Sequence, residues 1–313
     1  WTGLGPGDVM LHAGAINWTY TLGVGIVDPL SAGGSAVLYN GHPDPAVWPR
    51  LIAEHRATVF AAVPGVYRQM LKYAAPEIAD LTSLRHCLSA GAALPPSLLA
   101  EWRARTGKDI YEAFGMSECS TFISSGPTTP VHPGSPGRPQ PGRVVAALPL
   151  EGGETPLPAG ETGVLAVRRD EPGLMLGYWN RPDEEREAFR GDWFVSGDLV
   201  EFDAAGYMHH HGRADEVMNA GGYRVSPAEV EKCLLAFPHV AEAAAAERPG
   251  RDADTSIIKA YVVMRDNASC DEAAILAHCH EHLAAYKRPR AVVFLETLPR
   301  NANGKLNRKA LPV

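Results

Sequence analysis

A glycine-rich, charged stretch from Gly212 to Glu231, GRADEVMNAGGYRVSPAEVE, divides the chain into two parts. Its second half has the signals of a helix start: Ser226 at the N-cap, Pro227 at the first helical position, and Glu229 spaced to complete a capping box. One face of this helix is expected to be apolar, made by Val230, Cys233, Leu234 and Phe237. So much glycine, charge and capping is typical of a joint between two domains.

The residues before this joint alternate short apolar runs with amphipathic stretches, the pattern of parallel α/β units. The expected strands are 36–39, 58–63, 84–89 and 109–114, and the expected helices are 46–55 and one that starts at 94–97, buries Leu98, Leu99 and Trp102, and stops at Gly107. Ligands bind at the carboxyl ends of such strands. Two turns, Gly91-Ala92-Ala93 and Gly115-Met116-Ser117-Glu118, are expected at such ends.

The rest of the chain changes character twice. Residues 124–143 are rich in proline, glycine, serine and threonine, which predicts a long surface loop, and 144–211 has short strands with glycine turns, as in a small β-barrel or meander. The residues after the joint predict helices at 226–237 and 271–284 and strands at 240–246, 257–264 and 291–296. We therefore expect a large α/β domain at 1–213, of which 142–213 is β-barrel-like, and a compact α+β lid at 214–313.

Composition excludes several classes of protein. The formal net charge of -7 provides no basic footprint for nucleic acid, and no apolar run approaches the roughly 20 residues that span a bilayer. The five cysteines form no CxxC pair and predict reduced thiols in a cytoplasmic protein. Neither His209-His210-His211 nor the trio His278, His280 and His282 has the arrangement of a metal site, so both are expected to be structural or solvated.

Four motifs occur before, at and after the joint, in the order in which one enzyme family has them. They are Gly91-Ala92-Ala93; Phe114-Gly115-Met116-Ser117-Glu118; Phe194-Val195-Ser196-Gly197-Asp198-Leu199 with Arg213 fifteen residues after Asp198; and Pro299-Arg300-Asn301-Ala302-Asn303-Gly304-Lys305. Together they resemble the adenylate-forming enzymes: acyl-CoA synthetases, aryl-CoA ligases, luciferases and peptide-synthetase adenylation domains. The resemblance implies activation of a carboxylic acid by ATP, which supplies AMP as a leaving group.

The resemblance implies a role for each motif. Gly91, Ala92, Ala93, Phe114 and Gly115 would flank adenine, Ser117 would contact a phosphate, and Glu118 would bind the Mg²⁺. Asp198 would accept hydrogen bonds from both ribose hydroxyls, and Arg213 would reach the ribose or the α-phosphate. Lys305 would bridge the acid and the α-phosphate. Asp215 would be the hinge on which the lid swings, and Gly221 and Gly222 would line the passage for the pantetheine arm.

The sequence indicates the acid substrate and the thiol acceptor less specifically than it indicates the nucleotide site. His12, Trp18 and Tyr20 lie in a stretch resembling the acid-pocket entrance of benzoate-type and medium-chain CoA ligases, and Met116 would complete the pocket, so an aryl acid is favoured over a medium-chain fatty acid. Residues 220–227 look like a coenzyme A ligase, whereas the ending 306–312 leans towards domains that load a carrier protein.

One motif of the family is missing from this sequence: the Ser/Thr/Gly-rich phosphate loop that ends in lysine. In relatives it precedes a region resembling 8–25, so we expect the first part of the large domain to lie outside these 313 residues. A non-catalytic module that binds a nucleotide or a partner is the alternative that this absence favours.

Overall fold

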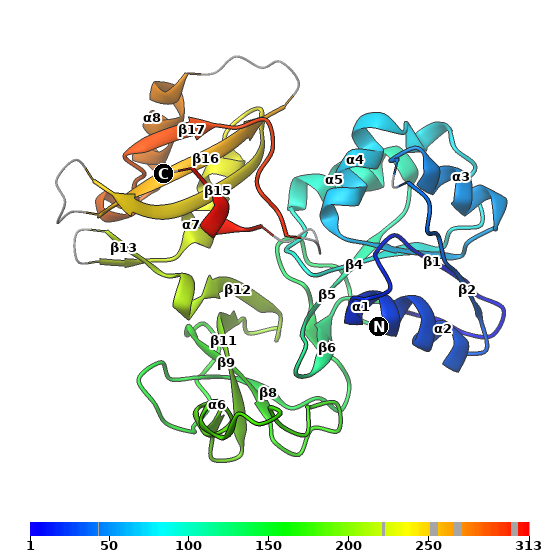
Figure 1. The fold of residues 1–313 in the computed structure, drawn as a ribbon, viewed down its shortest axis with the longest axis horizontal. Coiled ribbons are helices and arrows are strands. Elements are labelled where there is room, and N and C mark those ends of the chain that lie inside the picture. Colours follow the sequence, from blue (N-terminus) through cyan, green and yellow to red (C-terminus); the bar gives the residue numbers. More distant parts are fainter. Residues whose placement is uncertain (43, 221–222, 251–255, 266–270, 302–305, 313) are drawn as a thin grey trace. The chain divides into compact units, whose positions relative to one another are not determined.

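The computed structural model describes residues 1–42, 44–220, 223–250, 256–265, 271–301 and 306–312 (Figure 1). The chain divides into two compact units. The first comprises Trp1–Ser196 and Glu201–His209, and the second comprises Gly197–Val200 and His210–Val313.

The first unit is built on a seven-stranded sheet with the order β2-β1-β3-β4-β5-β6-β7. Its strands are β1 (Val9–His12), β2 (Ser35–Val37), β3 (Val59–Ala62), β4 (His86–Ala90), β5 (Ile110–Met116), β6 (Ser120–Ser124) and β7 (Arg138–Pro139). The first five strands in this order are parallel, and β6 and β7 join antiparallel. The predicted parallel α/β architecture is therefore confirmed.

Helices cover both faces of this sheet (Figure 1). The helical segments are α1 (Thr19–Leu22), a π-helix (Gly23–Val27), α2 (Asp28–Ser31), α3 (Val47–Glu54), α4 (Pro64–Tyr73), a 3-10 turn (Pro76–Ile78) and α5 (Pro96–Thr106). Helices α3, α4 and α5 bury one apolar cluster against the sheet, and Tyr20 and Val24 belong to a second cluster with the side chains of the other face. The predicted face of α5 is buried, and the helix ends at Gly107 with φ +69°.

The predicted surface loop at 124–143 is only partly correct. Ser124 belongs to β6, the short strand β7 lies within the range, and Ser125 and Ser135 are fully buried. The Ser135 hydroxyl donates to the Met208 carbonyl at 2.7 Å. Small polar residues are typical of loops, but here their hydroxyls satisfy buried backbone groups.

A second sheet follows, with the order β10-β11-β9-β8 and β12 paired to β11. Its strands are β8 (Val145–Leu148), β9 (Gly163–Arg168), β10 (Phe189–Arg190), β11 (Trp193–Phe202) and β12 (Met208–Arg213), and the short helix α6 (Pro182–Glu187) precedes β10. The succession of short strands matches the β-barrel-like expectation, and its core contains Leu148, Val164 and Trp193.

The second unit contains a three-stranded sheet, β15-β16-β17, in which β15 and β16 are antiparallel and β16 and β17 parallel. Its elements are a 3-10 turn (Ala214–Glu216), β13 (Met218–Ala220), β14 (Tyr223–Val225), α7 (Pro227–Ala236), β15 (Val240–Pro249), β16 (Ser256–Met264), α8 (Glu272–His282), a 3-10 turn (Ala285–Lys287), β17 (Ala291–Phe294) and a 3-10 turn (Arg308–Ala310). Val230, Cys233 and Leu234 of α7 share one core with Ile275 and Cys279 of α8. The predicted apolar face of α7 is confirmed.

The predicted capping box at the start of α7 is wrong. Ser226 is the N-cap residue and Pro227 opens the helix, but the Ser226 side chain caps no helical N–H. Its hydroxyl donates instead to the carbonyl of His211, and Glu229 accepts from Lys287 Nζ at 2.6 Å. Both side chains therefore fasten α7 to neighbouring segments of the second unit.

Cys87, Cys119, Cys233 and Cys279 are buried free thiols, as predicted, and Cys270 lies outside the described residues. Within the described ranges, none of the helices combines the length and apolar character that crossing a bilayer requires.

Candidate active site

Two of the predicted turns meet at one edge of the first sheet. Strands β4 and β5 are neighbours, with Ala90 opposite Ala113, so Gly91, the residue after β4, lies next to the position of Phe114 in β5. Ala92 and Ala93 are exposed. The buried carboxylate of Glu112 accepts the Leu94 N–H at 2.9 Å and so holds the end of this turn. Burial raises the pKa of Glu112 to about 8.

Glu112 was not singled out from the sequence. The available signal was a carboxylic acid in an otherwise apolar strand.

Trp18 brings the predicted acid pocket to the predicted adenine turn. Gly91 has φ +86°, and a Cβ built there would lie 2.6 Å from Cη2 of the Trp18 indole. The indole therefore lies directly against the backbone of Gly91, and any residue with a Cβ at that position would collide with it. Trp18 in turn contacts Tyr20 edge-to-face, with ring centroids 5.3 Å apart, and Tyr20 contacts His12 at 4.6 Å.

His12 is buried and neutral. Burial lowers the pKa of His12 to about 3, and its Nδ1 accepts the Gly14 N–H at 2.9 Å, so the ring proton is on Nε2. Within the described structure, His12 Nε2, Tyr20 Oη and Thr21 Oγ1 are buried without a hydrogen-bond partner. The ideal Cβ position of Gly14 lies 2.3 Å from Thr21 Oγ1 and 3.0 Å from His12 Cε1, so these two side chains flank the same glycine.

The motif from Phe114 to Glu118 begins inside β5, because the strand runs to Met116, two residues beyond its predicted end. The register shifts between Phe114 and Gly115, and a Cβ on Gly115 would lie 2.2 Å from the Ser120 carbonyl oxygen. Glycine is required there because the hairpin to β6 passes so close. Ser117 is exposed and Glu118 is half-buried.

Glu118 is held by a segment that the sequence did not indicate. The Tyr178 hydroxyl donates to Glu118 Oε1 at 3.0 Å, and the Met175 N–H donates to the Glu118 carbonyl at 2.6 Å. The half-buried carboxylate of Glu118, next in the sequence to the exposed Ser117, fits Mg²⁺, which takes one or two protein oxygens and completes its shell with phosphates and water.

The predicted ribose and hinge residues meet in the second unit. Asp198 is buried, its Oδ1 lies 2.9 Å from His210 Nε2, and its Oδ2 lies 3.8 Å from Arg213 Nη1. Arg213 Nε also donates to Asp215 Oδ1 at 2.8 Å, and this hydrogen bond holds the pKa of Asp215 below its usual value. The Asp198 carboxylate therefore lies between the His210 imidazole and the Arg213 guanidinium.

The histidines make separate contacts. His209 Nε2 lies 3.5 Å from Asp203, whereas the neighbouring His210 reaches Asp198. In α8, His278 donates to the Cys233 carbonyl at 3.1 Å and His282 to the His278 carbonyl at 2.8 Å. Across the residues that the structure describes, no three His, Cys, Asp or Glu side chains gather as a metal-binding group.

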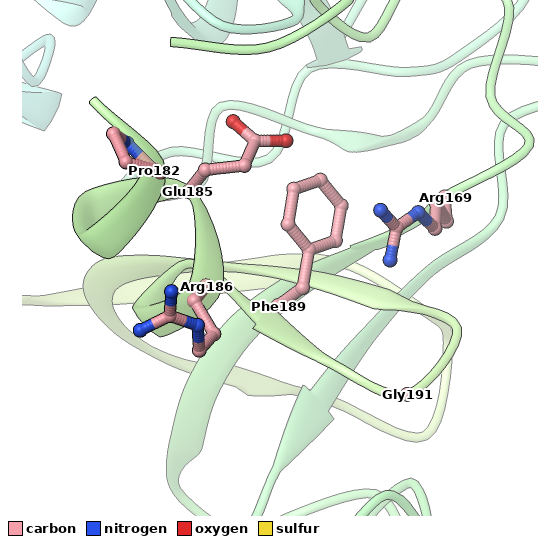
Figure 2. A pocket seen from close by; sticks show the side chains of 6 residues that line it. All are labelled: Arg169, Pro182, Glu185, Arg186, Phe189 and Gly191. Carbon is pink, nitrogen blue, oxygen red and sulfur yellow. The ribbon is translucent and has the colours of Figure 1, made fainter. Parts of the chain in front are cut away.

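Three predicted residues, Lys305, Gly221 and Gly222, lie outside the described residues. A surface pocket of the first unit contains none of the predicted site residues; Figure 2 shows its lining by Arg169, Pro182, Glu185, Arg186, Phe189 and Gly191.

Comparison with known proteins gives the family of the chain. Residues 1–179 match the model of the AMP-binding enzymes, and residues 229–305 match the C-terminal domain of AMP-binding enzymes. The chain belongs to the AMP-binding enzyme family.

Several similar proteins are coenzyme A ligases. The chain is 35% identical to benzoate–CoA ligase of Thauera aromatica over 98% of its own length and 58% of that protein. It is 37% identical to sulfoacetate–CoA ligase of Cupriavidus necator over 98% of its length and 59% of that protein. The crystal structure of an anthranilate CoA ligase in complex with anthranoyl-AMP matches with a TM-score of 0.86 and 34% identity, over 97% of this chain and 59% of that one. The chain thus spans less than two thirds of these relatives.

Proposed function

We propose that the full-length protein is an AMP-forming acyl-CoA ligase. One observation carries the proposal: in a chain of the AMP-binding family, the turn at Gly91 follows β4, Phe114 lies in the neighbouring strand β5, Glu118 follows β5, and Trp18 lies against Gly91. A nucleotide site and an acid site side by side are what a carboxylate needs to attack the α-phosphorus of ATP and release pyrophosphate.

Each residue has a physical task in this reaction. Gly91, Ala92 and Ala93 let the backbone approach adenine, and Phe114 offers a ring face. Ser117 donates to a phosphate, Glu118 binds Mg²⁺, and Asp198 accepts from the ribose hydroxyls, with Arg213 beside it. Mg²⁺, when bound, neutralises charge on the phosphates. Lys305 stabilises the charge shared by the acid and the α-phosphate, and a thiol then attacks the acyl carbon and expels AMP.

The acid that fits best is an aryl acid with a hydrogen-bonding substituent. His12, Trp18 and Tyr20 form an aromatic wall, and Met116 stands at the end of β5. The three unpaired polar atoms at His12, Tyr20 and Thr21 favour such an acid over a fatty acid, because an alkyl chain would leave buried donors unsatisfied.

Coenzyme A is the acceptor that the relatives support, since the similar proteins named above are coenzyme A ligases. We place the boundary between the large domain, 1–213, and the lid, 214–313, at the joint that carries Asp215. A cytoplasmic location stays a prediction from the sequence.

Pyrophosphate release tests the proposal directly. The full-length protein with ATP and Mg²⁺ is expected to release pyrophosphate with 3-hydroxybenzoate faster than with hexanoate, and to form a thioester with coenzyme A. The His12→Phe variant should reduce the preference for the hydroxylated acid over benzoate by about tenfold, the effect of one or two hydrogen bonds. Tight ATP binding without pyrophosphate release for any acid would indicate a binding module, and thioester formation only on a carrier pantetheine would identify the other acceptor.

The hinge gives a second prediction. Asp215 lies in a single 3-10 turn between β12 and β13, none of whose residues is buried. The Asp215→Pro variant restricts the φ angle that a swinging lid must change. We expect adenylation to continue and thioester formation to fall at least tenfold, whereas Asp215→Ala, which also loses the bond to Arg213, should retain thioester formation. Gly222→Leu should block the same step. Normal thioester formation in Asp215→Pro would rule out this hinge.

A further inference from the structure

We propose that Tyr178 is a positioning residue that holds the Glu118 carboxylate in the orientation that binds Mg²⁺, and that residues 171–178 form an arm built to place it. This inference rests on the proposed role of Glu118. Tyr178 lies 60 residues from Glu118 in the sequence, and its hydroxyl reaches Oε1 at 3.0 Å.

The contact fixes one oxygen and leaves the other available. A tyrosine hydroxyl donates a single hydrogen bond, so it restrains the rotation of the carboxylate while Oε2 remains for a cation. The same arm also holds the backbone of Glu118, because the Met175 N–H donates to the Glu118 carbonyl at 2.6 Å. Glu118 is thus held at its main chain and its side chain by one segment.

The arm is anchored at both ends by charged groups. At its start, the buried Glu171 pairs with Arg143 and accepts the Gly173 N–H at 3.1 Å. At its end, Glu185 of α6 accepts the Tyr178 N–H at 2.9 Å. Breaking a buried ion pair leaves an uncompensated charge, so the start of the arm is firmly held.

Apolar burial alone does not account for the position of the arm, in which Leu174 and Met175 are only half-buried. Leu176 and Trp179, the large apolar side chains beside Tyr178, have exposed fractions of 108% and 89%. The arm is fixed mainly by polar contacts that end on Glu118, and its side chains contribute little to the core. Orienting the Glu118 carboxylate explains the position of the arm better than packing does.

The test is metal affinity in Tyr178→Phe, which removes only the hydroxyl. In the full-length protein with an ATP analogue that has a methylene group between the α and β phosphates, we expect Mn²⁺ binding, followed by electron paramagnetic resonance, to weaken about three- to tenfold. The Mg²⁺ concentration that half-saturates pyrophosphate release should rise by the same factor, with the rate at saturating Mg²⁺ little changed. Tyr73→Phe, the same substitution at an exposed tyrosine, is the matched control.

Glu118→Gln separates the inference from the proposed function. If Glu118→Gln weakens Mn²⁺ binding and Tyr178→Phe adds nothing in that background, the two side chains act through one another, as proposed. If Glu118→Gln weakens binding but Tyr178→Phe does not, or only lowers the melting temperature, the arm is structural and the positioning role is wrong. If Glu118→Gln leaves Mn²⁺ binding unchanged, both the metal role of Glu118 and the inference fail.

Discussion

Lys305→Ala in the full-length protein is expected to slow acyl-adenylate formation by roughly 10²–10³-fold or more, the effect of removing one donor that meets charge developing in a transition state. Thioester formation from added acyl-adenylate should continue near its normal rate, because in the proposed mechanism the lid then moves Lys305 away. Separate measurements of pyrophosphate release and of thioester formation check the two steps. Equal losses in both would contradict the role assigned to Lys305.

The arginines near Lys305 in the sequence have partners of their own, so the substitution tests Lys305 alone. Arg300 pairs with Glu242, and Arg308 pairs with Glu231 at 2.8 Å and with Glu216 at 2.7 Å. These two arginines are therefore bound into the second unit and are not part of a solvated basic tail. Lys232→Ala, on the exposed side of α7, is the control for the loss of one lysine and should leave both steps unchanged.

Asp198→Asn is expected to weaken AMP and ATP binding by roughly 10- to 150-fold, because a hydrogen bond to a charged group contributes about 1.5–3 kcal/mol. The structure supports this substitution over alanine. Asp198 is also the partner of His210 and Arg213, so an isosteric amide disturbs their packing least. Isothermal titration calorimetry with AMP measures the change, and a melting curve shows whether folding is affected.

Asp203→Asn is the matched control. Asp203 lies in the turn between β11 and β12, where Oδ1 accepts the N–H groups of Ala205 and Tyr207, each at 2.9 Å. Asp203 has the ordinary role of an aspartate that caps a turn. We expect a change in stability without a change in nucleotide affinity for Asp203→Asn. Unchanged affinity in Asp198→Asn as well would assign Asp198 a structural role, through its contacts with His210 and Arg213.

The sequence by itself determined the elements whose cause is local. Helical spacing predicted the buried face of α5, and a glycine that tolerates a positive φ marked its end. The alternation of strands and helices predicted the parallel sheet, and the sheet then required the turns after β4 and β5 to meet at one edge. These features follow from side-chain period and backbone sterics within about ten residues.

Only the tertiary structure decided which polar group meets which. The Ser226 hydroxyl caps no helical N–H and donates instead to the His211 carbonyl, fifteen residues earlier. Glu112 holds Leu94, Tyr178 reaches Glu118, and His210 pairs with Asp198, each across strands or loops. A hydrogen bond of this kind depends on where distant backbones pass one another, and that is fixed by the packing of the whole unit rather than by any local pattern.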